Sequence, residues 1–190
     1  MRQARSRKGI RCGGRSGITL LEVMVALTVL VIGLVASMQA MVALERAQER
    51  TREVGRATQY ARQLIERIQA EAFAEAFRRY NGDPNDDPGG AATAPGCNFA
   101  VPGLTARAND PDGLPGEVIF PTPPGLPGNL RESIVDTKCG MPRDLNGDGV
   151  IDSVTNCATT YKILPVRVRV RWTGAAGPAE VELHSMLGNY

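Results

Sequence analysis

Oxygen-bearing side chains recur at alternating positions in residues 144–152, which read Asp-Leu-Asn-Gly-Asp-Gly-Val-Ile-Asp. Candidate ligand oxygens come from the side chains of Asp144, Asn146, Asp148 and Asp152 and from the carbonyl of Val150. Oxygen ligands at this spacing suit a hard cation such as calcium, and the glycine at position 149 permits the sharp turn that such a loop needs. Calcium bound in this way serves stability or interaction, and it does not catalyse.

The same nine residues resemble the first nine positions of EF-hand-like and dockerin-like calcium loops. On this reading, Ile151 ties the loop to the core. The stretch departs from these loops at Thr155, the twelfth position, where they carry a bidentate acid. The last ligands must then come from Thr155 itself, Asn156, a more distant acid such as Asp136, or water. An Asx-rich turn without a metal is the alternative.

Two cysteines, Cys139 and Cys157, flank this loop. A disulfide between them would hold the ends of the loop together and contribute on the order of 3 kcal/mol. Cys97 would then be free, although its pairing with either of the others, its pairing with a partner subunit, and three buried thiols are all open alternatives. A zinc site is not expected, because the chain has no close CxxC spacing.

Catalytic motifs are scarce. The sequence has no nucleophile elbow, no phosphate-binding loop and no HExxH, and its one histidine is His184. Ser185 follows His184 directly, but neighbouring residues of a strand point to opposite faces, so the two do not form a dyad. The sequence therefore predicts a protein that is not an enzyme and has no organic cofactor.

An apolar stretch from Ile18 to Leu44 contains a single ionisable side chain, Glu22. As a helix rising about 1.5 Å per residue, it is long enough to cross a bilayer core of about 30 Å. Its length, and the unbroken helix-compatible run behind it, favour a membrane anchor over a secretory signal cut near Ser37. By the positive-inside rule its amino-terminal end is cytoplasmic, because six basic residues precede it: Arg2, Arg5, Arg7, Lys8, Arg11 and Arg15.

A carboxylate such as that of Glu22 is costly at the edge of a membrane helix, so it is read as functional by default. Pairing with the terminal ammonium of a neighbouring subunit would offset this cost and fix the axial register between two such helices. The alternative is a glutamate that snorkels to the membrane interface.

Residues 17–27, Gly-Ile-Thr-Leu-Leu-Glu-Val-Met-Val-Ala-Leu, resemble the cleavage and methylation motif of type IV prepilins and type II secretion pseudopilins. The resemblance implies that a prepilin peptidase cuts after Gly17 and that the new terminus, Ile18, is N-methylated. Glu22 then takes the fifth mature position, where the family places its glutamate. Ile18 departs from the phenylalanine that is most common there. The closest resemblance is to minor pilins of the pilus-modification type, and the I-type minor pseudopilin of type II secretion is a near relative.

The resemblance implies an α+β fold, a pilin-like lollipop whose long amino-terminal helix packs on a small antiparallel β-sheet. We expect a cleaved cytoplasmic leader (1–17), a helix (18–80) that is transmembrane over 18–44, and a loop-rich extracytoplasmic β-domain (81–190). The turn signal Asn-Gly-Asp-Pro at 81–84 ends the helix. Beyond the membrane its apolar face is predicted to contain Ala47, Val54, Ala61, Leu64, Ile65, Ile68 and Ala72.

A carboxy-terminal hairpin is predicted from strict alternation. Valines at 166, 168 and 170 alternate with arginines, a turn follows at 174–178, and Val181 and Leu183 then alternate with acids. The apolar side is expected to face the helix, and the arginines to face glutamates across the strands. Residues 118–120 are a further candidate strand, although the prolines around them disfavour a central position in the sheet.

Charge counts separate the leader from the rest of the chain. The chain has 22 basic and 20 acidic residues, and loss of the six leader cations leaves 16 against 20. No basic patch is expected on the retained part, and hence no nucleic-acid binding.

The sequence predicts a minor type IV pilin with a priming, tip or adhesion role. It would be held in the inner membrane with its domain in the periplasm, and would then reach the pilus at the cell surface. The implied partners are a prepilin peptidase/N-methyltransferase and other pilins or pseudopilins, bound through the helix. The alternatives are a type II secretion minor pseudopilin, a membrane-anchored calcium-binding adhesion module that never polymerises, and a secreted hydrolase.

Overall fold

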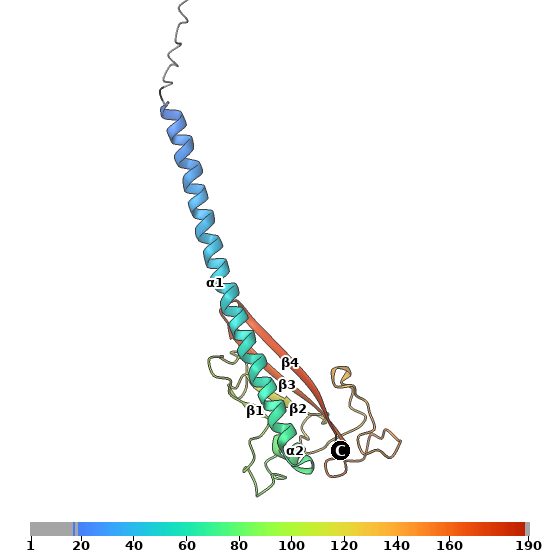
Figure 1. The fold of residues 1–190 in the computed structure, drawn as a ribbon. Helices are drawn as coiled ribbons and strands as arrows, with labels where there is room; N and C mark the ends of the chain where they lie inside the picture. Colours follow the sequence, from blue (N-terminus) through green and yellow to red (C-terminus); the bar gives the residue numbers. More distant parts are fainter. Residues whose placement is uncertain (1–16, 18, 189–190) are drawn as a thin grey trace, which may run out of the picture. The chain divides into compact units, whose positions relative to one another are not determined.

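The computed structural model describes residue 17 and residues 19–188. Two helices precede a four-stranded sheet (Figure 1). The elements are α1 (Leu20–Ala70), α2 (Phe73–Tyr80), β1 (Asn98–Phe99), β2 (Gly116–Ile119), the 3₁₀ turn η1 (Thr137–Cys139), β3 (Ile163–Gly174) and β4 (Gly177–Gly188). The chain divides into two compact units, residues 1–44 and residues 45–190, with the boundary inside α1.

The described part of the first unit is dominated by the beginning of α1. Its large apolar side chains are exposed, from Leu20 at 81% to Leu44 at 59%. Among the described residues, α1 is the helix that is long and apolar enough to cross a membrane. These side chains therefore require an apolar environment that residues 20–44 do not supply to one another.

In the second unit, small residues bring the rest of α1 close to the sheet. Ala57 and Ala61 are fully buried one turn apart, and Ile68 continues the same face. Of the predicted apolar face, Ala61 and Ile68 are in the core, whereas Ala47, Val54 and Ala72 are exposed. The buried face also includes Glu53. The predicted face did not contain it, because that prediction considered apolar residues alone.

The single helix expected up to Tyr80 is interrupted at residues 71 and 72. Ala72 has an extended ψ of 121°, and α2 begins at the next residue. No proline or glycine causes this break, but aromatic packing accompanies it. The rings of Phe73 and Tyr161 have centroids 4.9 Å apart, those of Phe77 and Phe120 are 5.2 Å apart, and the Tyr161 hydroxyl donates to the Phe73 carbonyl. Tertiary contacts have overridden helix propensity here.

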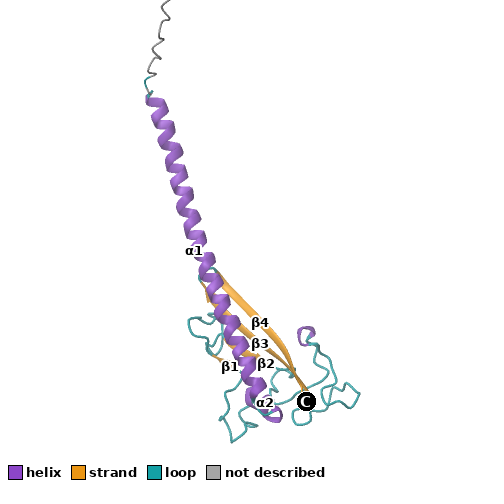
Figure 2. Cartoon of the chain, in the orientation of Figure 1, coloured by secondary structure: helices purple, strands orange, loops and turns teal. Residues whose placement is uncertain are grey.

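All pairs in the sheet are antiparallel, in the order β1-β2-β3-β4. β3 and β4 pair along their whole length, from Ile163 with Gly188 to Gly174 with Gly177, and the two residues between them form the turn. The predicted hairpin and the α+β fold class are confirmed. Figure 2 shows that long loops link α2 to β3 and contain only short elements.

β2 is a central strand, contrary to the expectation drawn from the prolines. Pro115 and Pro121 lie just outside its ends, so neither occupies a ladder position. Gly116 begins the strand because the ring of Phe99 lies against it, and a Cβ there would be 2.2 Å from that ring. The prolines limit the length of this strand and leave its pairing intact.

The sheet face opposite the core carries the arginines. Arg169 is in register with Glu182, and Arg171 with Glu180, as predicted. Their ion pairs, however, reach other elements: Arg169 with Glu117 (2.6 Å), Arg167 with Asp136 (3.3 Å), Arg171 with Asp110 (3.6 Å) and Glu182 with Lys138. These pairs attach β2, η1 and the loop before β2 to the hairpin.

Candidate functional site

The amino-terminal candidate site begins at Gly17, which is exposed. Residues 1–16 of the leader and Ile18 lie outside the described residues, and with Ile18 the predicted methylation position. Thr19 caps α1, because its Oγ1 accepts the Glu22 backbone N–H at 3.3 Å and its carbonyl accepts that of Val23 at 3.2 Å. The sequence analysis missed Thr19, although Thr-x-x-Glu is the spacing of a capping box.

Glu22 is exposed in the first turn of α1. With Val23, Ala26, Leu27 and Leu30 it lines a shallow hollow of about 340 Å³. The small side chain of Ala26, one turn along the helix, leaves this space beside the carboxylate. A negative charge is favourable near a helix amino terminus, where the backbone N–H groups point. This face presents one carboxylate within an apolar surface, an arrangement that can receive a cation.

The second candidate site is the loop at residues 144–152, where the backbone supplies the hydrogen bonds. Asp144 accepts the N–H of Gly147 at 2.6 Å and that of Gly149 at 2.8 Å. These bonds, that from Gly149 first, lower the pKa of the Asp144 carboxyl. Asn146 and Asp148 each accept the N–H two residues further on, both at 2.8 Å. The stretch is therefore a series of Asx turns.

Asp152 repeats this pattern at the end of the loop, because it accepts the N–H of Val154, two residues further on, at 2.9 Å. Its Oδ1 accepts the N–H groups of Val154 and Thr155, and the hydrogen bonds from Thr155 lower its pKa most. Across residues 17 and 19–188, no three Asp, Glu, His or Cys side chains gather closely enough to hold a metal ion. The three acids among the predicted ligands, Asp144, Asp148 and Asp152, are thus not gathered around one point, and calcium binding stays a prediction.

Glu132, which the sequence analysis did not single out, organises this loop from inside the protein. Its side chain is fully buried, and it accepts the N–H groups of Leu145 (2.9 Å), Asn146 (3.2 Å) and Asp152 (3.2 Å). The expected core contact of Ile151 is wrong, because Ile151 is 51% exposed. Leu145, which is fully buried, ties the loop to the core instead. No local sequence pattern marks Glu132, because its partners lie at least 13 residues away.

The predicted Cys139–Cys157 disulfide is not formed in the structure, where both are buried free thiols, and Cys97 is a half-buried one. Cys139 Sγ lies 3.9 Å from His184 Nδ1, and Cys157 Sγ donates to Glu132 Oε1 at 3.5 Å. Burial, and then the charge of Asp136, raises the pKa of Cys139 to about 11. Burial, and then the charge of Glu132, raises the pKa of Cys157 to about 12. Each thiol therefore has a neighbour of its own rather than the other cysteine.

His184 and Ser185 have different neighbours, as the strand alternation predicts. His184 lies beside Cys139 near η1, whereas Ser185 Oγ accepts from Gln69 of α1 at 3.3 Å. The sheet thus separates the two side chains.

Comparison with known protein families finds a match for one segment of the chain. Residues 13–38 match the prokaryotic N-terminal methylation motif, and the matched segment includes Gly17, Thr19 and Glu22. No curated protein and no solved structure matches the chain. The motif, together with an exposed apolar helix that fits a membrane anchor, supports a type IV pilin or pseudopilin. Such a protein is structural, is processed by a prepilin peptidase and associates with other subunits of this class.

Proposed function

We propose that the chain is a minor type IV pilin of the pilus-modification type, which joins a pilus in a priming, tip or adhesion role. The observation that carries the proposal is the methylation motif at residues 13–38, which continues into an exposed apolar helix containing Glu22. The peptidase cuts after Gly17 on the cytoplasmic side, and methylation of Ile18 follows. The domain after the membrane segment lies in the periplasm and later at the cell surface.

In this proposal the apolar residues 20–44 contact lipid before assembly and other subunits afterwards. The two environments are both apolar, so transfer from one to the other costs little hydrophobic free energy. Glu22 is the exception, because its carboxylate is stable among helices only when a cation pairs with it. The terminal ammonium of the neighbouring subunit supplies this cation and selects one axial register.

Co-expression with a prepilin peptidase tests this function. The expected product loses residues 1–17 and starts at methylated Ile18, as read by intact mass and amino-terminal sequencing. Gly17→Val should block the cut, because a branched side chain then stands at the cleaved bond. Gly14→Val, at another leader glycine, should leave cleavage unchanged. A wild-type chain that stays uncut, or that is cut near Ser37, would remove the proposed class.

A type II secretion minor pseudopilin is the second candidate, because the same motif and the same processing serve both systems. Reconstitution separates the two. Incorporation into a surface filament in cells with only the pilus machinery supports the pilin. Incorporation only in cells with the secretion machinery supports the pseudopilin. A chain that is processed but joins neither assembly is the non-polymerising anchored module.

A further inference from the structure

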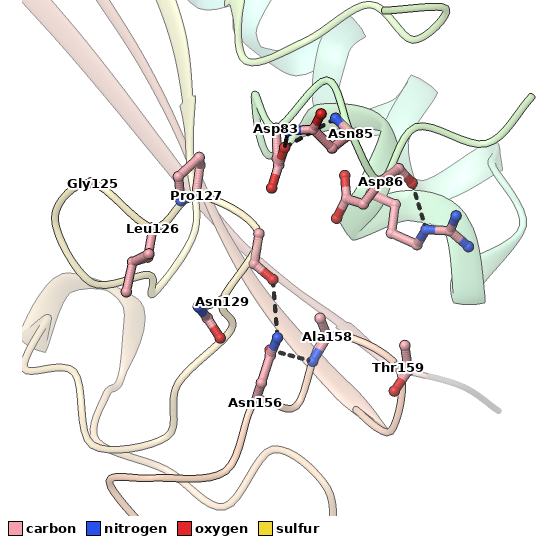
Figure 3. Close-up of a pocket in the computed structure, with 12 residues that line it drawn as sticks. Asp83, Asn85, Asp86, Gly125, Leu126, Pro127, Asn129, Asn156, Ala158 and Thr159 are labelled. Carbon is pink, nitrogen blue, oxygen red and sulfur yellow. Dashed lines mark hydrogen bonds between the residues drawn. The ribbon is translucent and has the colours of Figure 1, made fainter. Parts of the chain in front are cut away.

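A pocket of about 790 Å³ opens on the second unit, and neither candidate site uses it. Three loop segments form its walls: residues 83–86 after α2, residues 125–129 and residues 156–159. Figure 3 shows Asp83, Asn85 and Asp86 on one side of the hollow, and Asn129 and Asn156 on the loops opposite. The volume lies within the range of about 300–1,000 Å³ that is usual for small-molecule sites.

Hydrogen bonds between the walls fix the shape of the pocket. Asn156 donates to the Gly128 carbonyl at 3.2 Å, and its Oδ1 accepts the N–H groups of Leu130 and Ala158, both at 3.0 Å. Across the pocket, Arg78 Nε donates to the Asp86 carbonyl at 2.7 Å. Because the loops are held before any ligand arrives, binding loses little free energy to ordering them.

Two carboxylates converge on Gly128 at one side of the pocket. A Cβ at Gly128 would lie 2.6 Å from Asp83 Oδ2 and 3.5 Å from Asp86 Oδ2. Asp86 Oδ1 is shielded from solvent and has no hydrogen-bond donor among the described residues. Burial, and to a smaller degree the charge of Asp83, raises the pKa of Asp86, although a hydrogen bond from Asn81 opposes this. Asn85 donates to Asp83 Oδ1, which leaves Asp83 Oδ2 to accept a hydrogen bond from a ligand.

The rest of the lining offers unused polar groups beside apolar surface. Within the described part of the chain, the amide of Asn129 and the hydroxyl of Thr159 make no side-chain hydrogen bond, and each can both donate and accept. Leu126 is 49% exposed at the rim and supplies the apolar surface. Donors, acceptors and an apolar rim together match the hydroxyls and C–H faces of a sugar. The charges of Asp83 and Asp86 outweigh that of Arg78, so an acidic sugar would be repelled.

We propose that this pocket binds a saccharide without acidic groups, with Asp83, Asn129 and Thr159 as hydrogen-bonding residues. The site lies wholly within residues 45–190 and uses no part of the methylation motif. The proposal goes beyond pilus assembly and is independent of it.

Glycan binding by the full chain in phosphatidylcholine nanodiscs tests the proposal, because nanodiscs avoid sugar-based detergents. The probes are lactose, mannobiose and N,N′-diacetylchitobiose, with sialyllactose and digalacturonate as acidic counterparts, all in EDTA to keep calcium out. We expect at least one neutral probe to bind and neither acidic probe to do so. Failure of every neutral probe, or binding of an acidic one alone, overturns the proposal.

Two pocket variants and a matched control locate the binding. Asn129→Ala removes an amide whose side chain has no hydrogen-bond partner among residues 17 and 19–188, and Asp83→Asn keeps the acceptor for Asn85 but removes the charge. Each should weaken binding about tenfold, the usual effect of one lost hydrogen bond. Asn109→Ala, at an exposed asparagine elsewhere, should leave it unchanged. If all three variants bind the sugar with wild-type affinity and show wild-type thermal unfolding, the sugar binds at another place.

Discussion

Buried carboxylates at two single positions hold the second unit together. Glu53, on α1, accepts from Trp172 Nε1 at 3.0 Å and from the Ala175 N–H at 3.1 Å, so it fastens the hairpin turn to the helix. Glu132 does the same for the loop at 144–152 through three backbone N–H groups. An acid can occupy such a place only because donors replace the water that it loses.

Glu53→Ala should lower the free energy of unfolding by about 1–3 kcal/mol, because it leaves the buried Trp172 Nε1–H, and the less buried N–H of Ala175, without an acceptor. Gly174 adds to the effect. Gly174 lies so close to Glu53 that a Cβ at position 174 would be 1.9 Å from Glu53 Oε2. Because glycine has no side chain, Gly174 cannot fill the space that the shortened side chain leaves. Trp172 is the only tryptophan, and its fluorescence during urea unfolding reports the change directly.

Glu49→Ala is the matched control for Glu53→Ala. Glu49 lies one turn earlier and makes a surface ion pair with Arg52 at 3.5 Å, which is worth at most about 0.5 kcal/mol. Equal losses of stability in the two variants would show that the Glu53 hydrogen bonds contribute nothing specific.

The three thiols among the described residues, Cys97, Cys139 and Cys157, should differ in their reactivity. Alkylation needs the thiolate, and at pH 8 a pKa of about 11 leaves Cys139 ionised in only about one molecule in a thousand. Cys157, with a pKa of about 12, should react more slowly still, whereas the half-buried Cys97 should be modified first. Iodoacetamide labelling of the folded chain, followed by peptide mass spectrometry, gives the order. Recovery of a peptide pair in which Cys139 is joined to Cys157 would show that the predicted disulfide forms.

Among the elements, those with local periodicity were predictable from the sequence. The hairpin follows from alternation within β3 and β4, and the membrane segment follows from composition alone. The break before α2 was not predictable, because the aromatic contacts that accompany it involve Phe120 and Tyr161, far along the chain. The pocket likewise depends on three loops that only the tertiary fold brings together.

Calcium binding by the loop at residues 144–152 can be tested by thermal unfolding. If the loop binds calcium, the melting temperature of the chain should rise in millimolar calcium. Asp144→Ala should abolish this rise, and Asp112→Ala, at an acid outside the loop, should not. An unchanged melting temperature in the wild type identifies the loop as metal-free Asx turns held by Glu132.

Over the whole molecule, the apolar residues divide into two groups with different environments. The core, from Ala57 to Leu187, lies entirely within residues 45–190. The exposed apolar residues 20–44 add nothing to it, so their burial must come from lipid or from other subunits. Cleavage after Gly17, as proposed, would also leave an excess of acidic residues on the retained chain. Stability of the second unit and assembly through the first should therefore respond to different substitutions.

Glu22→Ala tests this separation. The variant should still be cut after Gly17 and should still insert in the membrane, because apolar length decides insertion. Its incorporation into filaments should fall at least tenfold, since an unpaired buried charge costs about 3–5 kcal/mol and here the partner's ammonium loses its counter-charge. Glu45→Ala, at an exposed glutamate beyond the apolar residues, is the control and should assemble normally. Quantifying each variant in sheared filaments against the membrane fraction gives the ratio. Normal incorporation of Glu22→Ala would contradict this role. The Glu22 carboxylate would then act only as a favourable charge in the first turn of α1.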